Sequence, residues 1–131
     1  MPTPFKVLAA AVFAAATLVL AVPIQAEEIL KSGTFSGENG HETSGTVQIV
    51  QMDDAYAVRF DADFAHDGTA PDATVGLGKD GYDASTNLGP LTANEGAQTY
   101  ALPAGFDPAA ANEVYVWCRK FSVSLGVATL K

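Results

Sequence analysis

The chain has 131 residues, a formal net charge of −8 at pH 7 and only seven lysines and arginines. The basic residues form no stripe along the sequence, so nucleic acid and anionic membrane surfaces are poor partners for it. There is one cysteine, so no disulfide can form within the chain.

The first 26 residues have the pattern of a secretory signal peptide. Lys6 supplies the positive start, and an apolar run rich in Ala, Val and Leu extends from Val7 to Ile24. Small Ala26 suits the position before a signal-peptidase cut, and two glutamates follow at once. We predict cleavage after Ala26, which leaves residues 27–131 as the mature protein in an extracytoplasmic compartment, either secreted or periplasmic.

An uncleaved membrane anchor is the alternative for the same segment. The run from Val7 to Ile24 has 18 residues, the lower limit for a helix that spans a bilayer. Pro23 near its end and the abrupt change to polar sequence favour cleavage instead, so no membrane association is expected of the mature form. Without residues 1–26 the chain keeps 105 residues, enough for a single domain with its own core.

From Gly33 onward, short runs of alternating or β-branched residues are broken by Gly, Pro, Asn and Asp. This pattern predicts an all-β fold, a small antiparallel sandwich or barrel, with no helix of ordinary length. The expected strands cover residues 34–36, 46–51, 55–61, 73–77, 98–102, 113–118 and 121–129. A tight turn at residues 52–54 joins the second and third strands. It leaves Tyr56, Val58 and Phe60 on one face, so we expect these three side chains in the core.

The last third of the chain combines one helical turn with two strands. Asp107 and Pro108 precede three alanines, which is the pattern of an N-cap, a proline at the first helical position and one turn. In the next strand Cys118 shares a face with valines 114 and 116, whereas the apolar residues of 121–129 fall at odd positions. If Cys118 faces the core, a bulge or bend is therefore expected near residues 119–120.

A series of short motifs runs through nearly all of the predicted mature chain. They are Ser-Gly-Thr-Phe at 32–35, His-Glu-Thr-Ser-Gly-Thr-Val at 41–47, Phe60, Asp63-Phe64, Pro71-Asp72, Val-Gly-Leu at 75–77, Leu-Gly-Pro-Leu at 88–91, Gly-Ala-Gln-Thr-Tyr at 96–100 with Leu102-Pro103, and Val-Trp-Cys-Arg-Lys-Phe at 116–121 with Gly126 and residues 128–130. In this order and spacing they resemble the electron-transfer DM-thirteen domain family, found in secreted and cell-surface proteins including the Skeletor group of animals. Gly76 departs from the family pattern, because an aromatic residue is common at its position.

The resemblance implies an all-β domain with a cysteine at the position of Cys118 and a redox or electron-transfer role outside the cytoplasm. Members of the family often accompany further redox domains of the membrane or cell surface. This chain offers the domain alone. Its electron partner is then expected to be a separate redox or cell-surface protein.

Cys118 is the candidate redox thiol, and Lys120 is the candidate residue that tunes its pKa. In a regular strand residue 120 shares the face of residue 118 at roughly 7 Å, where a cation favours the thiolate. The alternative is a small apolar cysteine packed in the core, because free cysteine is among the most buried residue types. The chain would then be a non-enzymatic extracellular binding or adhesion module.

Aromatic residues near the cysteine offer a relay for an electron. These are Tyr100, Tyr115 and Trp117, although aromatic side chains in strands usually serve packing. No catalytic signature accompanies them, since Gly-x-Ser-x-Gly is absent from the sequence. A stand-alone enzyme is therefore not predicted.

No cofactor is predicted from the sequence, and copper and calcium are the weaker alternatives. The residue types of a blue-copper site occur at His41, Met52, His66 and Cys118. No His or Met follows Cys118, as the usual copper-binding sandwiches require. An acidic loop around Gly68 contains Asp61, Asp63, Asp67 and Asp72. Its spacing is not that of a calcium-binding EF-hand, and a solvated loop is the better interpretation.

Overall fold

The computed structural model describes residues 14–18 and 27–131. Their regular structure is almost entirely strand, which confirms the all-β prediction. The strands are β1 (Glu28–Gly37), β2 (Thr43–Ser44), β3 (Thr46–Met52), β4 (Ala55–Phe60), β5 (Ala65–His66), β6 (Ala73–Gly78), β7 (Tyr82–Asp83), β8 (Gly89–Pro90), β9 (Gln98–Ala101), β10 (Glu113–Cys118) and β11 (Val123–Thr129). Two single 3-10 turns are present, η1 (Ala84–Thr86) and η2 (Pro108–Ala110).

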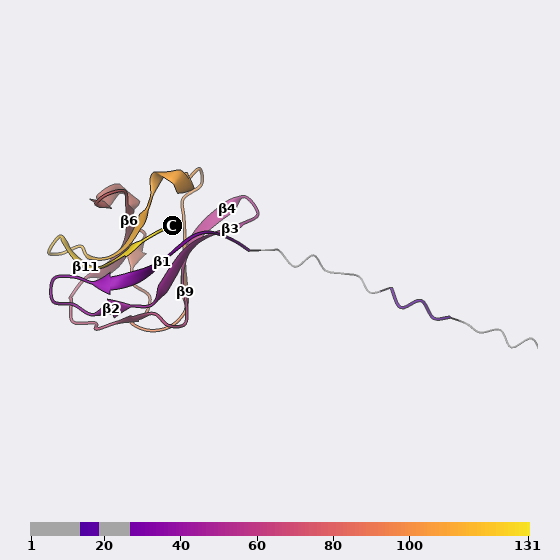
Figure 1. Cartoon of the computed structure of the whole chain (residues 1–131), viewed down its shortest axis with the longest axis horizontal. Coiled ribbons are helices and arrows are strands. Elements are labelled where there is room, and N and C mark those ends of the chain that lie inside the picture. Colours follow the sequence, from indigo (N-terminus) through magenta and orange to yellow (C-terminus); the bar gives the residue numbers. More distant parts are fainter. Residues whose placement is uncertain (1–13, 19–26) are drawn as a thin grey trace, which may run out of the picture.

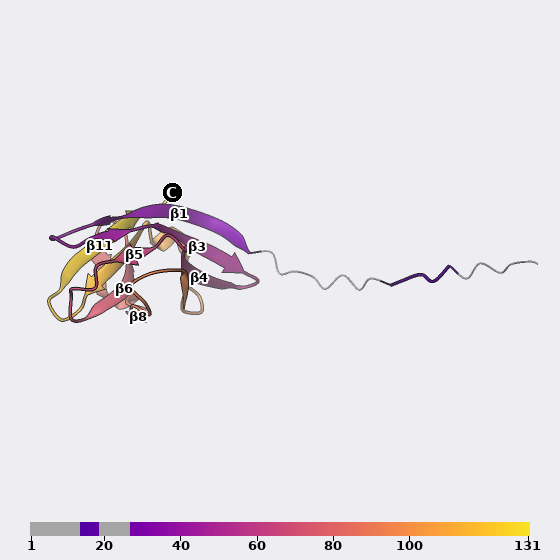
Figure 2. The ribbon, with the colours of Figure 1, turned by 90° about the horizontal axis from the view of Figure 1, so that it is seen from below.

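Most of the strands form one curled antiparallel sheet. Its order is β7-β6-β10-β11-β1-β3-β4-β9, and β8 also pairs with β6. Figures 1 and 2 show the sheet bent into a half-barrel, with β1 running across it and the C-terminus beside β1. Lys131 and Ser32 exchange two backbone hydrogen bonds of 3.0 Å there. The separate pair of β2 and β5 lies off this sheet.

One hydrophobic core fills the curl of the sheet. Its largest fully buried side chains include Phe60, Phe64, Ile49, Leu77 and Leu125. The rings of Phe60 and Phe64 pack with their centroids 4.5 Å apart. Val58 and Phe60 have no exposed surface, as predicted, and half-buried Tyr56 packs against the same cluster.

The ends of several strands differ from the sequence-based expectation. β1 is much longer than the predicted 34–36, because residues from Glu28 on pair with β3. β11 starts at Val123 and not at residue 121, because residues 119–122 form a turn in which Ser122 has a φ of 51°. The predicted helical turn is confirmed as η2, where the Asp107 carboxylate accepts a 2.9 Å bond from the Ala109 amide.

The bulge or bend expected near residues 119–120 is a bend, because residues 119–122 form the turn between β10 and β11. Core-facing Cys118 pairs with odd-numbered Val123 after this turn. A bulge that was not expected follows in β11, where the pairing shifts from Val116 with Gly126 to Trp117 with Ser124 and leaves Leu125 as the extra residue. Leu125 and Ala128 can therefore both face the core.

The predicted signal peptide lies mostly outside the described residues. Of residues 1–26, only 14–18 are described, and they are exposed and without regular structure. β1 begins two residues after the predicted cut. In the described ranges, no helix has the length and apolar character needed to cross a membrane.

Candidate functional site

Cys118 is the last residue of β10, in the interior of the sheet. It pairs with Ala73 of β6 on one side and with Val123 of β11 on the other. Its side chain is 1% exposed and belongs to the same buried cluster as Val114 and Val116. The thiol is free and faces the core. Direct attack of this thiol on a soluble partner requires the domain to open.

The regular strand that would place Lys120 beside the cysteine does not extend that far. β10 ends at Cys118, and Lys120 lies in the following turn with its ammonium 5.6 Å from the centroid of the Phe121 ring. Neighbouring Arg119 pairs with Asp72, at 3.3 Å between Nε and Oδ2. The expected placement of Lys120 on the Cys118 face of the strand is therefore wrong. That Lys120 tunes the pKa of the thiol stays a prediction, without this placement to support it.

The outer face of the same strand carries a cluster of three aromatic rings. Half-buried Trp117 stacks on Tyr82 of β7, with centroids 3.8 Å apart and planes 11° from parallel. Tyr115 meets both rings edge to face, at 5.7 Å and 6.1 Å. Two of the three predicted relay residues are thus in this cluster. The third, Tyr100 of β9, packs in the core instead, 5.4 Å from the Phe60 ring.

Tyr82 was missed by sequence reasoning, although Gly76 gave a signal for it. A Cβ on Gly76 would lie 2.5 Å from Cε2 of Tyr82, so the missing side chain makes room for this ring. The side-chain amide of Asn87 donates hydrogen bonds to the Tyr82 hydroxyl (3.0 Å) and to Thr74 Oγ1 (2.8 Å). The Thr74 hydroxyl in turn donates to the backbone carbonyl of Trp117 (2.8 Å). The absence of a side chain at position 76 therefore makes room for the stack.

Tyr115 remains a neutral phenol at physiological pH. Burial of the side chain, followed by the nearby Glu113 carboxylate, raises the pKa of Tyr115 to about 12. Its ordinary value is about 10. A tyrosine in this state gives up an electron only together with its proton, so Tyr115 is the weaker electron donor of the cluster.

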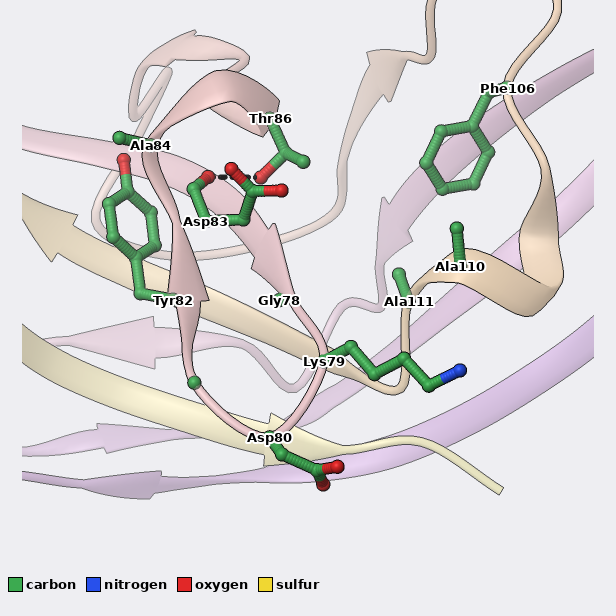
Figure 3. Close-up of a pocket in the computed structure, with 11 residues that line it drawn as sticks. Gly78, Lys79, Asp80, Tyr82, Asp83, Ala84, Thr86, Phe106, Ala110 and Ala111 are labelled. Atoms are coloured by element: carbon green, nitrogen blue, oxygen red, sulfur yellow. Dashed lines mark hydrogen bonds between the residues drawn. The ribbon is translucent and has the colours of Figure 1, made fainter.

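A surface cavity of about 440 Å³ lies next to the aromatic cluster (Figure 3). It is lined by the β6–β7 turn, by Phe106 and by η2. Tyr82 also lines it, on the side opposite Phe106. The Asp83 carboxylate beside it caps η1 through Ser85 and is not free for proton transfer. Lys79 and Asp80 of the β6–β7 turn also line this hollow beside Tyr82.

The residues of the alternative metal sites come together only in part: the rings of His41 and His66 lie 6.3 Å apart, and Asp67 lies beside both. Cys118 lies in the core, whereas Met52 is 39% exposed at the β3–β4 turn. Of the acidic loop, Asp63 accepts bonds from the amide and hydroxyl of Thr46, and Asp72 pairs with Arg119. Across residues 14–18 and 27–131, no three His, Cys, Asp or Glu side chains are grouped as metal ligands.

Comparison with known proteins assigns the chain to a family. Residues 34–130, which include the end of β1 from Thr34 and every later strand, match the model of a family of electron transfer domains. This is the electron transfer DM13 family, and the chain belongs to it. No curated protein and no solved structure matches the chain.

The burial of Cys118 predicts slow alkylation of the folded protein. Iodoacetamide should label the thiol at a rate limited by opening of the domain, and far more slowly than in denaturant. Cys118→Ser should destabilise the fold by about 1–3 kcal/mol in urea unfolding, because it places a hydroxyl in an apolar site. Cys118→Ala is the control that removes the sulfur without burying a hydroxyl. Labelling at the denatured rate, with a Ser variant within about 0.5 kcal/mol of wild type, would show a surface thiol instead.

Proposed function

We propose that the protein is an extracytoplasmic electron-transfer module that exchanges single electrons with a separate redox or cell-surface protein. The electron enters or leaves at the Trp117–Tyr82 stack, and Cys118 is the redox group behind it. Membership of the electron transfer DM13 family supports the general role. The observation that carries the route is the 3.8 Å stacking of Tyr82 on half-buried Trp117.

The route follows from the alternation of side chains along β10. Consecutive residues of a strand point to opposite faces. Trp117 therefore reaches the outer aromatic cluster while Cys118, the next residue, reaches the core. One peptide unit separates a ring at the surface from a thiol that solvent does not touch. A partner can thus exchange electrons with the interior without contacting the sulfur.

The proposed step is a one-electron oxidation. An oxidising partner takes one electron from the indole of Trp117, and the resulting radical is refilled by one electron from Cys118. As Cys118 becomes a thiyl radical, its proton passes to a water molecule, which reaches the buried sulfur only by local opening of the domain. A reducing partner later returns the electron through Trp117, and water returns the proton. A mixed disulfide would instead need direct access to the sulfur, which 1% exposure denies.

The extracytoplasmic location rests on two features of the sequence. Residues 1–26 have the charge, apolar run and small residue of a secretory signal. The resemblance to secreted and cell-surface domains of the Skeletor type points the same way. Without Lys6 the mature chain has a net charge of −9. Such a charge favours a partner with a basic docking surface.

A binding or adhesion module is the second candidate, favoured by the burial of Cys118. In that function Cys118 serves only as a small apolar core residue, and the Trp117 cluster is a contact surface for a ligand or partner. The two candidates make the same forecast for alkylation. They differ in whether Cys118→Ala changes the identity and the decay of the radical that follows oxidation of Trp117.

The location predicts a shortened chain in the producing cell. Intact-mass analysis of the protein recovered outside the cytoplasm should give a mass that begins at Glu27. Loss of the apolar run leaves the soluble half-barrel intact, because β1 begins at Glu28. A full-length mass found in the membrane fraction would establish the anchor and contradict cleavage.

The proposed entry point predicts that Trp117 dominates oxidation of the protein from outside. A photo-generated one-electron oxidant should react with Trp117→Phe at least about 10-fold more slowly than with wild type, a change of about 1.4 kcal/mol in the barrier. Transient absorption measures the rate, and Trp117 is the chain's only tryptophan. Tyr56→Phe, at another half-buried aromatic residue, is the control and should leave the rate unchanged. Equal rates for wild type and Trp117→Phe would contradict the route.

A further inference from the structure

The half-buried rings of Tyr82 and Trp117 share their face of the sheet with acidic side chains. Glu113 begins β10 and, by alternation along the strand, lies on the same outer face as Tyr115 and Trp117. Its carboxylate accepts a 2.7 Å hydrogen bond from the amide of Gly81, in the β6–β7 turn that leads to Tyr82. Because this bond fixes the carboxylate, its charge stays beside the aromatic cluster.

Two further carboxylates come from other elements. Asp80 lies in the same turn, where its amide donates to Oδ1 of Asn112 at 3.2 Å and its carboxylate accepts from the Asn112 side chain at 3.4 Å. Glu38 directly follows β1, and its amide donates to the carbonyl of Leu125 at 3.2 Å. Together with Glu113, Asp80 and Glu38 form the acidic rim of the aromatic cluster.

The negative charge of the acidic rim acts on the aromatic cluster. Burial of the ring is the main cause of the raised pKa of Tyr115, and the three rim carboxylates add to it. Charges close enough to disfavour a phenolate also attract a cation to the same place. In residues 14–18 and 27–131, no rim carboxylate forms an ion pair with a basic side chain of the chain itself. The rim is therefore available to positive charges of another molecule.

The nearest basic residues along the sequence do not compensate the acidic rim. Lys79 of the β6–β7 turn extends toward η2 and away from Tyr82 (Figure 3). Arg119 and Lys120 lie beyond the other end of β10, where Arg119 pairs with Asp72. The negative side of the aromatic cluster is thus the side formed by the start of β10 and the β6–β7 turn.

We propose that the acidic rim is the docking site for a basic electron-transfer protein. Lysines or arginines of this partner contact the rim, and its redox group then lies against the Trp117–Tyr82 stack. Glu113 and Trp117 are about 13 Å apart along β10, a span that one protein interface covers. Opposite charges speed the encounter of two proteins and fix their orientation, and salt screens this attraction. The inference rests on the proposed function, because it names the partner for the same entry point.

The test is an NMR titration of the ¹⁵N-labelled mature domain with reduced cytochrome c, a basic one-electron carrier used as the probe. At low salt, the amides whose signals shift should cluster at Gly81, Glu113 and Tyr115, together with the indole N–H of Trp117. Salt at about 200 mM should weaken the binding at least about 10-fold, because the Debye length is then below about 8 Å.

Two triple variants that remove the same charge separate the rim from the acidity of the whole chain. The rim variant keeps the size of its side chains and an acceptor oxygen for the amide of Gly81, and it should weaken the binding at least about 10-fold. It consists of Glu38→Gln, Asp80→Asn and Glu113→Gln. The control variant neutralises exposed acids of the β3–β4 turn and of the loop before β9, and it should bind within about threefold of wild type. It consists of Asp53→Asn, Asp54→Asn and Glu95→Gln.

Three outcomes would overturn the docking inference. They are no binding of cytochrome c at low salt, shifted amides that are scattered or lie at the control acids, and an equal loss of affinity in the two triple variants. If the rim variant does not fold, the position of the shifted amides in wild type decides. The titration needs no electron flow, so its failure is distinct from failure of the electron route, which the oxidation rate of Trp117→Phe measures.

Discussion

The arrangement of the whole domain depends on β10, which is hydrogen-bonded along both edges inside the curled sheet. Its neighbours β6 and β11 fix the register of all six residues. Because side chains alternate along a strand, this register sends Val114, Val116 and Cys118 into the core and leaves Tyr115 and Trp117 on the outer face. A shift by one residue would expose the thiol and bury the indole.

The bulge in β11 connects this strand to the separate pair of β2 and β5. Leu125 is the extra residue, and its carbonyl accepts bonds from the amide of Glu38 and the hydroxyl of Thr43. Thr43 in turn fixes the ring of His66. The irregular pairing that lets Leu125 face the core thus also positions a histidine in the separate β2–β5 pair.

The sequence predicted the fold class, most strands and the helical turn after Asp107, because period-two patterns and cap residues are local signals. It left open whether Cys118 faces the core. It expected a bulge or bend near residues 119–120 but began the last strand at residue 121, since the positive φ at Ser122 that extends the turn has no signature in a serine. The stack of Tyr82 on Trp117 joins distant segments, which a single sequence cannot pair. In the sequence, Gly76 is only a departure from the family pattern, and the structure shows that its missing side chain makes room for Tyr82.

The most direct test of the proposed electron route is to identify which residue carries the radical after one-electron oxidation of the folded protein. Freeze-quench electron paramagnetic resonance should be recorded after one-electron oxidation of wild type and of Cys118→Ala. We predict a sulfur-centred radical in wild type and a tryptophan or tyrosine radical in the variant, where no thiol can return an electron to Trp117. The same aromatic radical with the same decay in both proteins would contradict it, and would leave Cys118 as a packed core residue of a binding module.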